Sequence, residues 1–351
     1  MERRAMIPAS PRDTVAVTTI PAHRLASQLL ANNPLATPHA VVSHFGTMQA
    51  QDYLGALWAV GARMRSAVES DVERALAERK IVRCWPMRGT LHFVAAEDVR
   101  WILELLAPRV LKRHRLRLER DFELDAKTLR RCRTIVEREL RGGNALTRPE
   151  IYAALQKSRI ATTGSRGLHM LFALAHEFVI CFGARRGKQP TFVLLDEWLP
   201  DAKSKSRDES LAELARRYFN SHGPATIADF MWWSGLTMKE AKEAIALGEV
   251  DIDHAKRARM QSPHVQLLPP FDEYTVAYRD RSAVLDPAFT KQVNAGGGIF
   301  KAIVVIDGIV IGTWTRALRS KSVKVSTFRE LTAREARAVD RAAERYKSFV
   351  T

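Results

Sequence analysis

Residues 81–94, with the sequence IVRCWPMRGTLHFV, decide the predicted fold. The alternating side chains of 81–85 and 89–94 predict two strands, because successive side chains in a strand point to opposite faces. Pro86 and Arg88 lie between these runs, so we expect the strands to form a hairpin. Apolar residues at helical spacing precede it and predict helices near His23, after Pro38, over 53–65 and over 71–79. Helices followed by a two-stranded wing are the order of a winged-helix module.

The same order recurs more faintly along the chain. Further helices are expected from Pro149 and over 167–178, 211–219, 226–233 and 237–247, with strands at 179–182 and 191–195. Beyond residue 265, β-branched runs alternate around an Asp307-Gly308 turn, which predicts a small antiparallel sheet before a last helix over 332–349.

The predicted fold is therefore α+β, with tandem winged-helix modules followed by a small C-terminal antiparallel β subdomain. The expected parts are a flexible arm (1–20), a first winged-helix module (21–135), a second (136–205), a third (206–260), and the β subdomain with its terminal helix (261–351).

The charge of the chain indicates its partner. Of 351 residues, 55 are Lys or Arg and 39 are Asp or Glu, which gives a net charge of +16 and a pI near 10.1. Such an excess attracts a polyanion, so we expect double-stranded DNA as the partner. An arginine-rich proteome would produce the same charge, and this alternative stays open.

The cysteines and the N-terminal residues indicate the cellular compartment in which the protein is expected. Cys84, Cys132 and Cys181 are far apart and form no C-x-x-C pair, which indicates neither a disulfide framework nor a zinc site. Nothing requires a cofactor or a metal. No apolar run reaches about 18 residues, and prolines and charges stand where a signal peptide needs an apolar core. We expect a cytoplasmic, nucleoid-associated protein outside the membrane.

Two carboxamides, Gln49 and Gln51, are the first candidate catalytic groups. They lie two residues apart, so they point the same way if the segment is extended. Such a pair offers donors and acceptors without charge, which suits holding one water or one sugar oxygen. Most glutamines in a turn are surface residues, and these two are candidates only because of their context.

A second polar group follows in Thr90 and His92, which alternate onto one face of the predicted strand beside Arg88. A single histidine in a strand is most often structural. With Arg88, however, the hydroxyl and the imidazole would complete a polar pocket.

Basic segments are frequent, and the segment 183–189 (GARRGKQ) is the most informative of them because it forms the tip of a predicted hairpin. Cations on a wing can enter a groove or contact phosphates. The candidate DNA-binding residues are Arg88, Arg185, Arg186, Lys188, Arg279, Arg281, Arg316 and Lys321. By contrast, His176-Glu177 lacks the second histidine of a zinc peptidase, and Gly296-Gly297-Gly298 lacks the context of a nucleotide-binding loop.

Four separated segments resemble the AlkZ/YcaQ-like winged-helix DNA glycosylases. They are QAQD (49–52), RCWPMRGTLH (83–92), LLPPFDEYTVAYRDRS (267–282) and DGIVIGTW (307–314). The resemblance covers roughly residues 20–330, and the four motifs occur in the family's order. It implies tandem winged-helix modules and a C-terminal β subdomain around a DNA-binding concavity.

The resemblance also implies an activity, the removal of alkylated purines, including crosslinked bases, by hydrolysis of the N-glycosidic bond. Gln at position 51 places the chain in the AlkZ branch, whose motif is Gln-hydrophobic-Gln, and the family's Thr/His-x-His motif falls on Thr90 and His92. The chemistry agrees, because a cationic N7- or N3-alkylated purine leaves without a general acid and the enzyme mainly has to place a water. No lysine stands in the motif, so we expect a monofunctional enzyme that leaves an abasic site.

Two other classes of function stay open at this point. A non-catalytic winged-helix regulator would share the fold and the charge, although such regulators usually bind as dimers, whereas three modules in one chain need no partner copy. We therefore expect a monomer. A protein that binds an acidic ligand would share only the charge.

Overall fold

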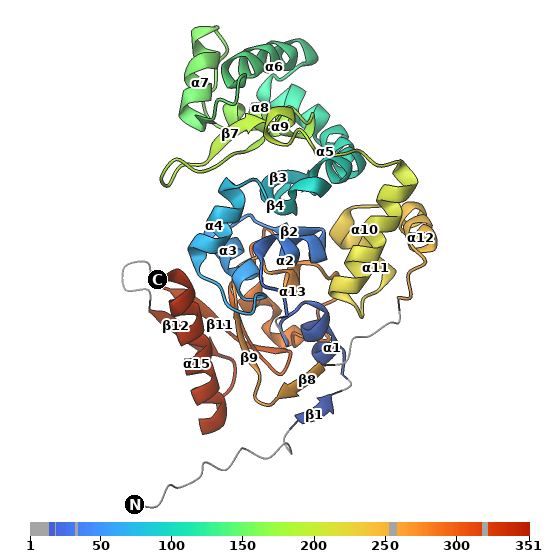
Figure 1. Ribbon diagram of the computed structural model, residues 1–351, viewed down its shortest axis with the longest axis vertical. Coiled ribbons are helices and arrows are strands. Elements are labelled where there is room, and N and C mark those ends of the chain that lie inside the picture. Colours follow the sequence, from blue (N-terminus) through green and yellow to red (C-terminus); the bar gives the residue numbers. More distant parts are fainter. Residues whose placement is uncertain (1–13, 18, 32–33, 253–257, 318–321) are drawn as a thin grey trace, which may run out of the picture.

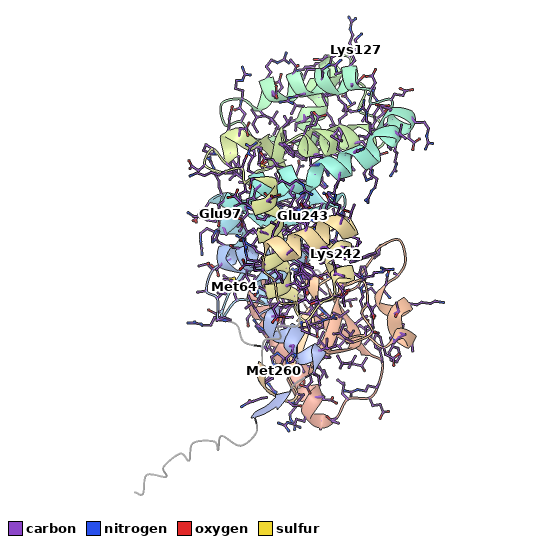
Figure 2. All side chains as sticks on the ribbon, turned by 90° about the vertical axis from the view of Figure 1, so that its right-hand side faces the viewer. Met64, Glu97, Lys127, Lys242, Glu243 and Met260 are labelled. Atoms are coloured by element: carbon purple, nitrogen blue, oxygen red, sulfur yellow. The ribbon has the colours of Figure 1, made fainter. Side chains whose placement is uncertain are left out.

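The computed structural model describes residues 14–17, 19–31, 34–252, 258–317 and 322–351 (Figure 1). It is a mixed α+β fold in which every sheet is small and antiparallel. The molecule is elongated. Figure 2 shows Lys127 near one end and Met260 near the other.

The first unit has the order α–β–α–α–β–β. It consists of α2 (Pro38–Phe45), β2 (Thr47–Gln49), α3 (Tyr53–Gly61), α4 (Glu69–Ala77), β3 (Ile81–Met87) and β4 (Thr90–Ala95), and it follows α1 (Ile20–Ser27). The strand order is β2-β4-β3. The predicted hairpin is confirmed, and its turn at Arg88-Gly89 has φ values of 55° and 76°, as a two-residue turn between twisted strands requires. The sequence did not predict β2, because three residues are too few to show a period.

The second unit repeats this order at one end of the molecule (Figure 1). It consists of α6 (Ala126–Leu140), β5 (Leu146–Thr147), α7 (Arg148–Lys157), α8 (Arg166–His176), β6 (Ile180–Phe182) and β7 (Thr191–Leu194), with the strand order β5-β7-β6. Helix α5 (Val99–Phe122) joins the units. The expected boundary between residues 135 and 136 falls inside α6, because Cys132, Val136 and Leu140 of this helix share a core with α7 and α8.

The third region differs from its expected form. Helices α10 (Arg207–His222), α11 (Ile227–Ser234) and α12 (Met238–Leu247) follow the short α9 (Leu195–Trp198), and Thr237 with Glu240 forms the predicted capping box. Within the described part of 206–260, however, no hairpin follows α12. The one strand there, β8 (Ala258–Gln261), pairs with β1 (Thr14–Val17). Residues 14–17 of the expected arm are therefore part of a sheet, and residues 1–13 lie outside the described ranges.

The C-terminal sheet has the predicted antiparallel form. Its strands are β9 (Val265–Leu268), β10 (Ile303–Ile306), β11 (Ile309–Arg316) and β12 (Val323–Thr327), in the order β12-β11-β10-β9. The predicted turn at Asp307-Gly308 joins β10 and β11. Short helical segments lie between β9 and β10, namely α13 (Glu273–Val276), the 3-10 turn Pro287–Phe289 and α14 (Thr290–Val293), and another 3-10 turn, Ala96–Asp98, precedes α5.

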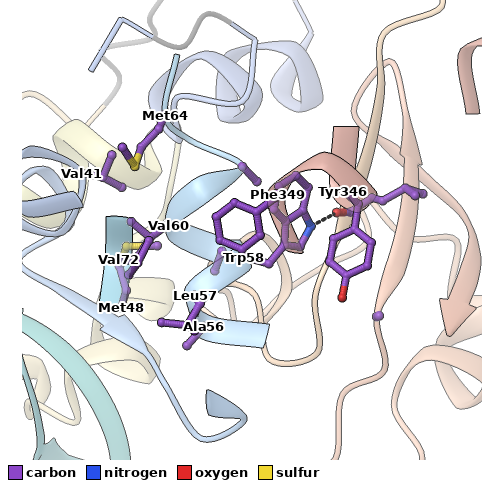
Figure 3. Packing of buried hydrophobic residues seen from close by; sticks show 14 of the residues in the cluster. Val41, Met48, Ala56, Leu57, Trp58, Val60, Met64, Val72, Tyr346 and Phe349 are labelled. Atoms are coloured by element: carbon purple, nitrogen blue, oxygen red, sulfur yellow. Dashed lines mark hydrogen bonds between the residues drawn. The ribbon is translucent and has the colours of Figure 1, made fainter. Parts of the chain in front are cut away.

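Helix α15 (Ala333–Val350) joins the C-terminal sheet to the first unit. Trp58 of α3 packs against Tyr346 and Phe349 of α15, with ring centroids 5.2 and 5.1 Å apart (Figure 3). The same buried cluster includes Val304 of β10 and Trp314 of β11. The first unit and the C-terminal part are therefore one packed body, although they are far apart in the sequence.

Candidate active site

The two predicted glutamines lie where β2 ends and α3 begins. Gln49 is the last residue of β2 and pairs with His92 of β4. The contact with β4 continues beyond it, because Ala50 N donates to Leu91 O at 2.6 Å and Leu91 N donates to Gln51 Oε1 at 3.2 Å. Gln49 is half-buried and Gln51 is exposed. Strand β4 thus fixes the backbone of the first glutamine and the side chain of the second.

Arg83 of β3 holds the backbone between the glutamines from the other side. Its Nε and Nη2 donate to Ala50 O at 3.0 and 2.8 Å, and Nη2 also donates to Gln51 O at 3.3 Å. Burial lowers the pKa of Arg83 to about 10, so the side chain still carries its charge at neutral pH. A fork of donors on two successive carbonyls leaves this segment little freedom.

Glu273 of α13 is a buried carboxylate beside the pair. Its Oε1 accepts from Gln49 N at 2.6 Å, and its Oε2 accepts from Trp233 Nε1 at 3.1 Å and lies 3.4 Å from His222 Nε2. Burial by itself would raise the pKa of Glu273. The hydrogen bond and charge of His222 and the hydrogen bond from Gln49 N lower it to about 2. Glu273 is therefore ionised at neutral pH.

His92 is fully buried and uncharged. Its Nδ1 lies 3.0 Å from Thr90 O, so Nδ1–H donates to that carbonyl and Nε2 carries the lone pair. Burial and then the charge of Arg88 lower the pKa of His92 to about 3, against the opposing charge of Glu273. Nε2 is buried and has no partner among the described residues. The Thr90 hydroxyl points back to Met87 O, at 3.5 Å.

Two arginines from separate sequence motifs are half-buried. Arg88 Nη2 donates to Gln49 Oε1 at 3.3 Å. Arg281 donates through Nε to Thr275 O at 2.6 Å and lies over the exposed Trp232. Burial lowers the pKa of both guanidinium groups, and for Arg281 the charge of Asp229 opposes this shift while the charge of Arg88 adds to it. Arg88 Nε and Arg281 Nη2 are buried without a hydrogen-bond partner in the described structure.

The hairpin tip of the second unit is already engaged within the protein. Arg185 lies 4.3 Å from the ring centroid of Tyr53 and 3.6 Å from Glu73, so it connects the tip to α3 and α4 of the first unit. Arg186 donates to Glu150 Oε1 at 2.7 Å. The sequence alone suggested that both guanidinium groups project freely from the hairpin. In the structure, neither of them does.

The other predicted DNA-binding residues are dispersed. Lys188 and Arg279 are exposed, and Arg316 is half-buried with its guanidinium 5.9 Å from the ring centroid of Tyr346. Lys321 lies outside the described residues.

Sequence reasoning missed Arg83 and Glu273. Both occur in the segments that carry the family resemblance, Arg83 at the start of RCWPMRGTLH and Glu273 in LLPPFDEYTVAYRDRS. The sequence feature that could have identified Glu273 is its acidic side chain within a segment that is otherwise largely apolar. Its role became visible only with its contact to Gln49, which is far away in the sequence.

Two searches of the described ranges found nothing further. No three His, Cys, Asp or Glu side chains there are grouped so that they could hold a metal ion. None of the helices in those ranges has both the length and the apolar character needed to cross a bilayer.

Comparison with known proteins places this site in a family. The sequence profile described as DNA glycosylase AlkZ-like matches residues 42–349. One relative, the interstrand DNA cross-link repair glycosylase of Streptomyces sahachiroi, is 27% identical over 325 residues, which are 84% of this chain and 86% of the relative. The solved structure of Streptomyces sahachiroi DNA glycosylase AlkZ has the same fold, with a TM-score of 0.77 at 23% identity, covering 94% of this chain and 95% of that one. Because the profile spans most of the chain, the protein belongs to the AlkZ-like family and is a DNA glycosylase that acts on N-glycosyl bonds.

Proposed function

We propose that this protein hydrolyses the N-glycosidic bond of N7- and N3-alkylated purines in double-stranded DNA and leaves an abasic site. The observation that carries the proposal is the neutral pair Gln49 and Gln51, held by Arg83 and β4 next to an ionised Glu273. Family membership favours this enzyme over a non-catalytic regulator.

The proposed roles follow from charge. An alkylated purine is cationic and leaves as a neutral base, so no general acid is needed. Gln49 Oε1 and Gln51 Oε1 each accept one hydrogen bond from the protein, and the second lone pair of each oxygen can accept a proton of the attacking water. Glu273 would place negative charge near the developing oxocarbenium ion. His92, with a lone pair on Nε2, would accept a hydrogen bond from the water and orient it, and Thr90 would hold the imidazole.

We further propose that Arg88 and Arg281 bind the phosphates that flank the lesion. Each has a buried nitrogen without a partner in the described structure, and an anion would satisfy both. Lys188, Arg279 and Arg316 would contact the DNA backbone more distantly, with Arg185 and Arg186 available only if their internal contacts open.

The finer family assignments are proposals as well. Gln51 supports the AlkZ branch. The shared α–β–α–α–β–β order and the shared strand order of the two units support two winged-helix modules. The cross-link repair activity named for the relative suggests that crosslinked purines are among the substrates, and a monomer would suffice, because all proposed site residues come from one chain.

A base-excision assay tests the proposed function. Duplex DNA with a single N7-methylguanine is incubated with the protein, and abasic sites are then cleaved with alkali. We expect strand scission with the wild-type protein and little with the Gln49→Ala/Gln51→Ala variant. Wild-type protein that binds this duplex but releases no base would overturn the proposal.

A further inference from the structure

A fully buried ion pair stands at the start of the short helix α13, whose first residue is Glu273. Arg63 Nη1 and Nη2 each donate to the carboxylate of Asp272 at 2.8 Å, and neither side chain has any exposed surface. Arg63 follows the end of α3 by two residues, and Asp272 directly precedes Glu273. The pair therefore joins the end of α3 to the helix that carries the buried carboxylate of the candidate active site.

Asp272 also caps α13. Its Oδ1 accepts from Tyr274 N at 2.9 Å, so the same oxygen binds the helix N-terminus and Arg63 Nη2. A helix of four residues is too short to be stable through its own backbone hydrogen bonds. Its position is set by the contacts at its ends, and these contacts decide where Glu273 points.

A second series of buried contacts leads from Arg63 to the other side of Glu273. Arg63 Nη2 donates to Gln28 Oε1 at 2.8 Å, and Gln28 Nε2 donates to the Tyr278 hydroxyl at 3.0 Å. That hydroxyl donates to His222 O at 2.8 Å, and His222 Nε2 lies 3.4 Å from Glu273 Oε2. All five side chains are buried. Two routes therefore connect the ion pair with Glu273, one through the backbone at Asp272 and one through His222.

The position of Glu273 matters because its carboxylate contacts the segment that carries the glutamines. Glu273 Oε1 accepts from Gln49 N at 2.6 Å. A displacement of a catalytic group by about 1 Å can cost on the order of 10² in rate. A buried ion pair is weak evidence for a role in stability, because the loss of hydration offsets the attraction between the charges. The arrangement of these contacts around α13 instead indicates a role in placing Glu273.

We propose that Arg63 and Asp272 are positioning residues, whose ion pair holds α13 so that the Glu273 carboxylate stays against the backbone of Gln49. Neither residue contacts DNA in this proposal, since both side chains are fully buried. The inference rests on the proposed function and adds two residues on which the rate of base excision depends. Loss of the pair should lower kcat and leave KM nearly unchanged.

The test replaces the pair by apolar residues in the Arg63→Met/Asp272→Leu variant, because such exchanges of buried ion pairs are often neutral for stability. The matched control is Arg109→Met/Glu240→Leu. Arg109 also donates two hydrogen bonds to one carboxylate, that of Glu240, at 3.0 and 2.9 Å, and Glu240 also caps a helix, α12. Helix α12 carries none of the proposed catalytic groups.

Both double variants are assayed on duplex DNA with a single N7-methylguanine, and urea unfolding shows whether each is folded under the assay conditions. We expect kcat of Arg63→Met/Asp272→Leu to fall by on the order of 10², with KM close to the wild-type value. The control should keep the wild-type kcat. A loss of the same size in the control would assign the effect to stability and overturn the proposal.

A conservative variant, Asp272→Asn, decides the question if the double variant does not fold. Asn keeps the helix cap but loses the charge that binds Arg63, so kcat should fall by less than in the double variant, again without a change in KM. A wild-type kcat in this variant, or in the folded double variant, would overturn the positioning role. Failure of the proposed function looks different, because the wild-type protein would then release no N7-methylguanine, and both proposals would fall.

Discussion

The first and second units share one chain order and one strand order, yet only the first carries the candidate active site. In the second unit, β5 runs directly into α7, and Thr147 both ends the strand and caps the helix through Glu150. In the first unit, Ala50, Gln51 and Asp52 separate β2 from α3, and Asp52 is the cap. Three additional residues between strand and helix thus create the segment that presents the second glutamine.

The hairpins of the two units differ in the length of their loops, and here the second unit has the longer one. The β3–β4 turn is tight, and its Arg88 folds back onto Gln49. The β6–β7 loop is long, and its Arg185 reaches across to Tyr53 and Glu73 of the first unit. We infer from this comparison that the first unit holds the proposed catalytic glutamines and that the second unit braces the first.

The largest effect is expected from removing either glutamine. Gln49→Ala or Gln51→Ala should lower the excision rate of N7-methylguanine by on the order of 10² to 10³, the usual cost of losing a positioned hydrogen-bonding group. DNA affinity should change little, because neither side chain is charged. Single-turnover excision and equilibrium binding measure the two quantities. Wild-type rates in both variants would remove the glutamines from the mechanism.

A smaller effect is expected at Arg83, whose guanidinium donates to the backbone carbonyls of Ala50 and Gln51. Arg83→Lys keeps the charge but cannot bridge Ala50 O and Gln51 O with a planar fork. We expect kcat to fall roughly tenfold with KM nearly unchanged, since the loss concerns geometry in the transition state. A rise in KM with an unaltered kcat would instead make Arg83 a DNA-binding residue.

Two buried histidines allow a matched comparison between the units. Burial lowers the pKa of His92 from 6.5 to about 3 and that of His176 in α8 from 6.5 to about 4. Below pH 6.5 the unfolded chain therefore binds protons that the folded protein does not. Their contribution to stability is complete above pH 6.5 and is lost as the pH falls toward these values.

Replacement of either histidine should flatten this loss of stability in acid, as measured by urea unfolding between pH 7 and roughly 4.5. Only His92→Asn should also reduce excision at pH 7, because the hydrogen bond of His176 stays within α8, with Phe172 O. Equal losses of activity in the two variants would return His92 to a structural role.

Local patterns were enough to predict most of the helices, the three hairpins and the cap at Thr237, because periodicity and turn chemistry act over a few residues. Strand β2 was not predicted because its three residues are too few to show a period, and it forms by pairing with the distant β4. Glu273 and Arg83 were not predicted for a related reason. Their roles depend on contacts with Gln49 N and Ala50 O, and these contacts join residues that are far apart in the sequence. The sequence also shows the cations at the tip of the β6–β7 hairpin. It could not show that two of them already pair with acidic side chains of the protein.

The smallest expected effect concerns that tip. From sequence, Arg185, Arg186 and Lys188 would each contribute about 0.9 to the slope of log K against log salt. Because Glu73 and Glu150 already engage the two arginines, we expect the triple alanine variant to lose only about 0.9, the share of one phosphate contact. Lys188→Ala alone should reproduce this change on undamaged duplex. A loss near three times that value would mean that DNA displaces both internal ion pairs and that the hairpin detaches from the first unit on binding.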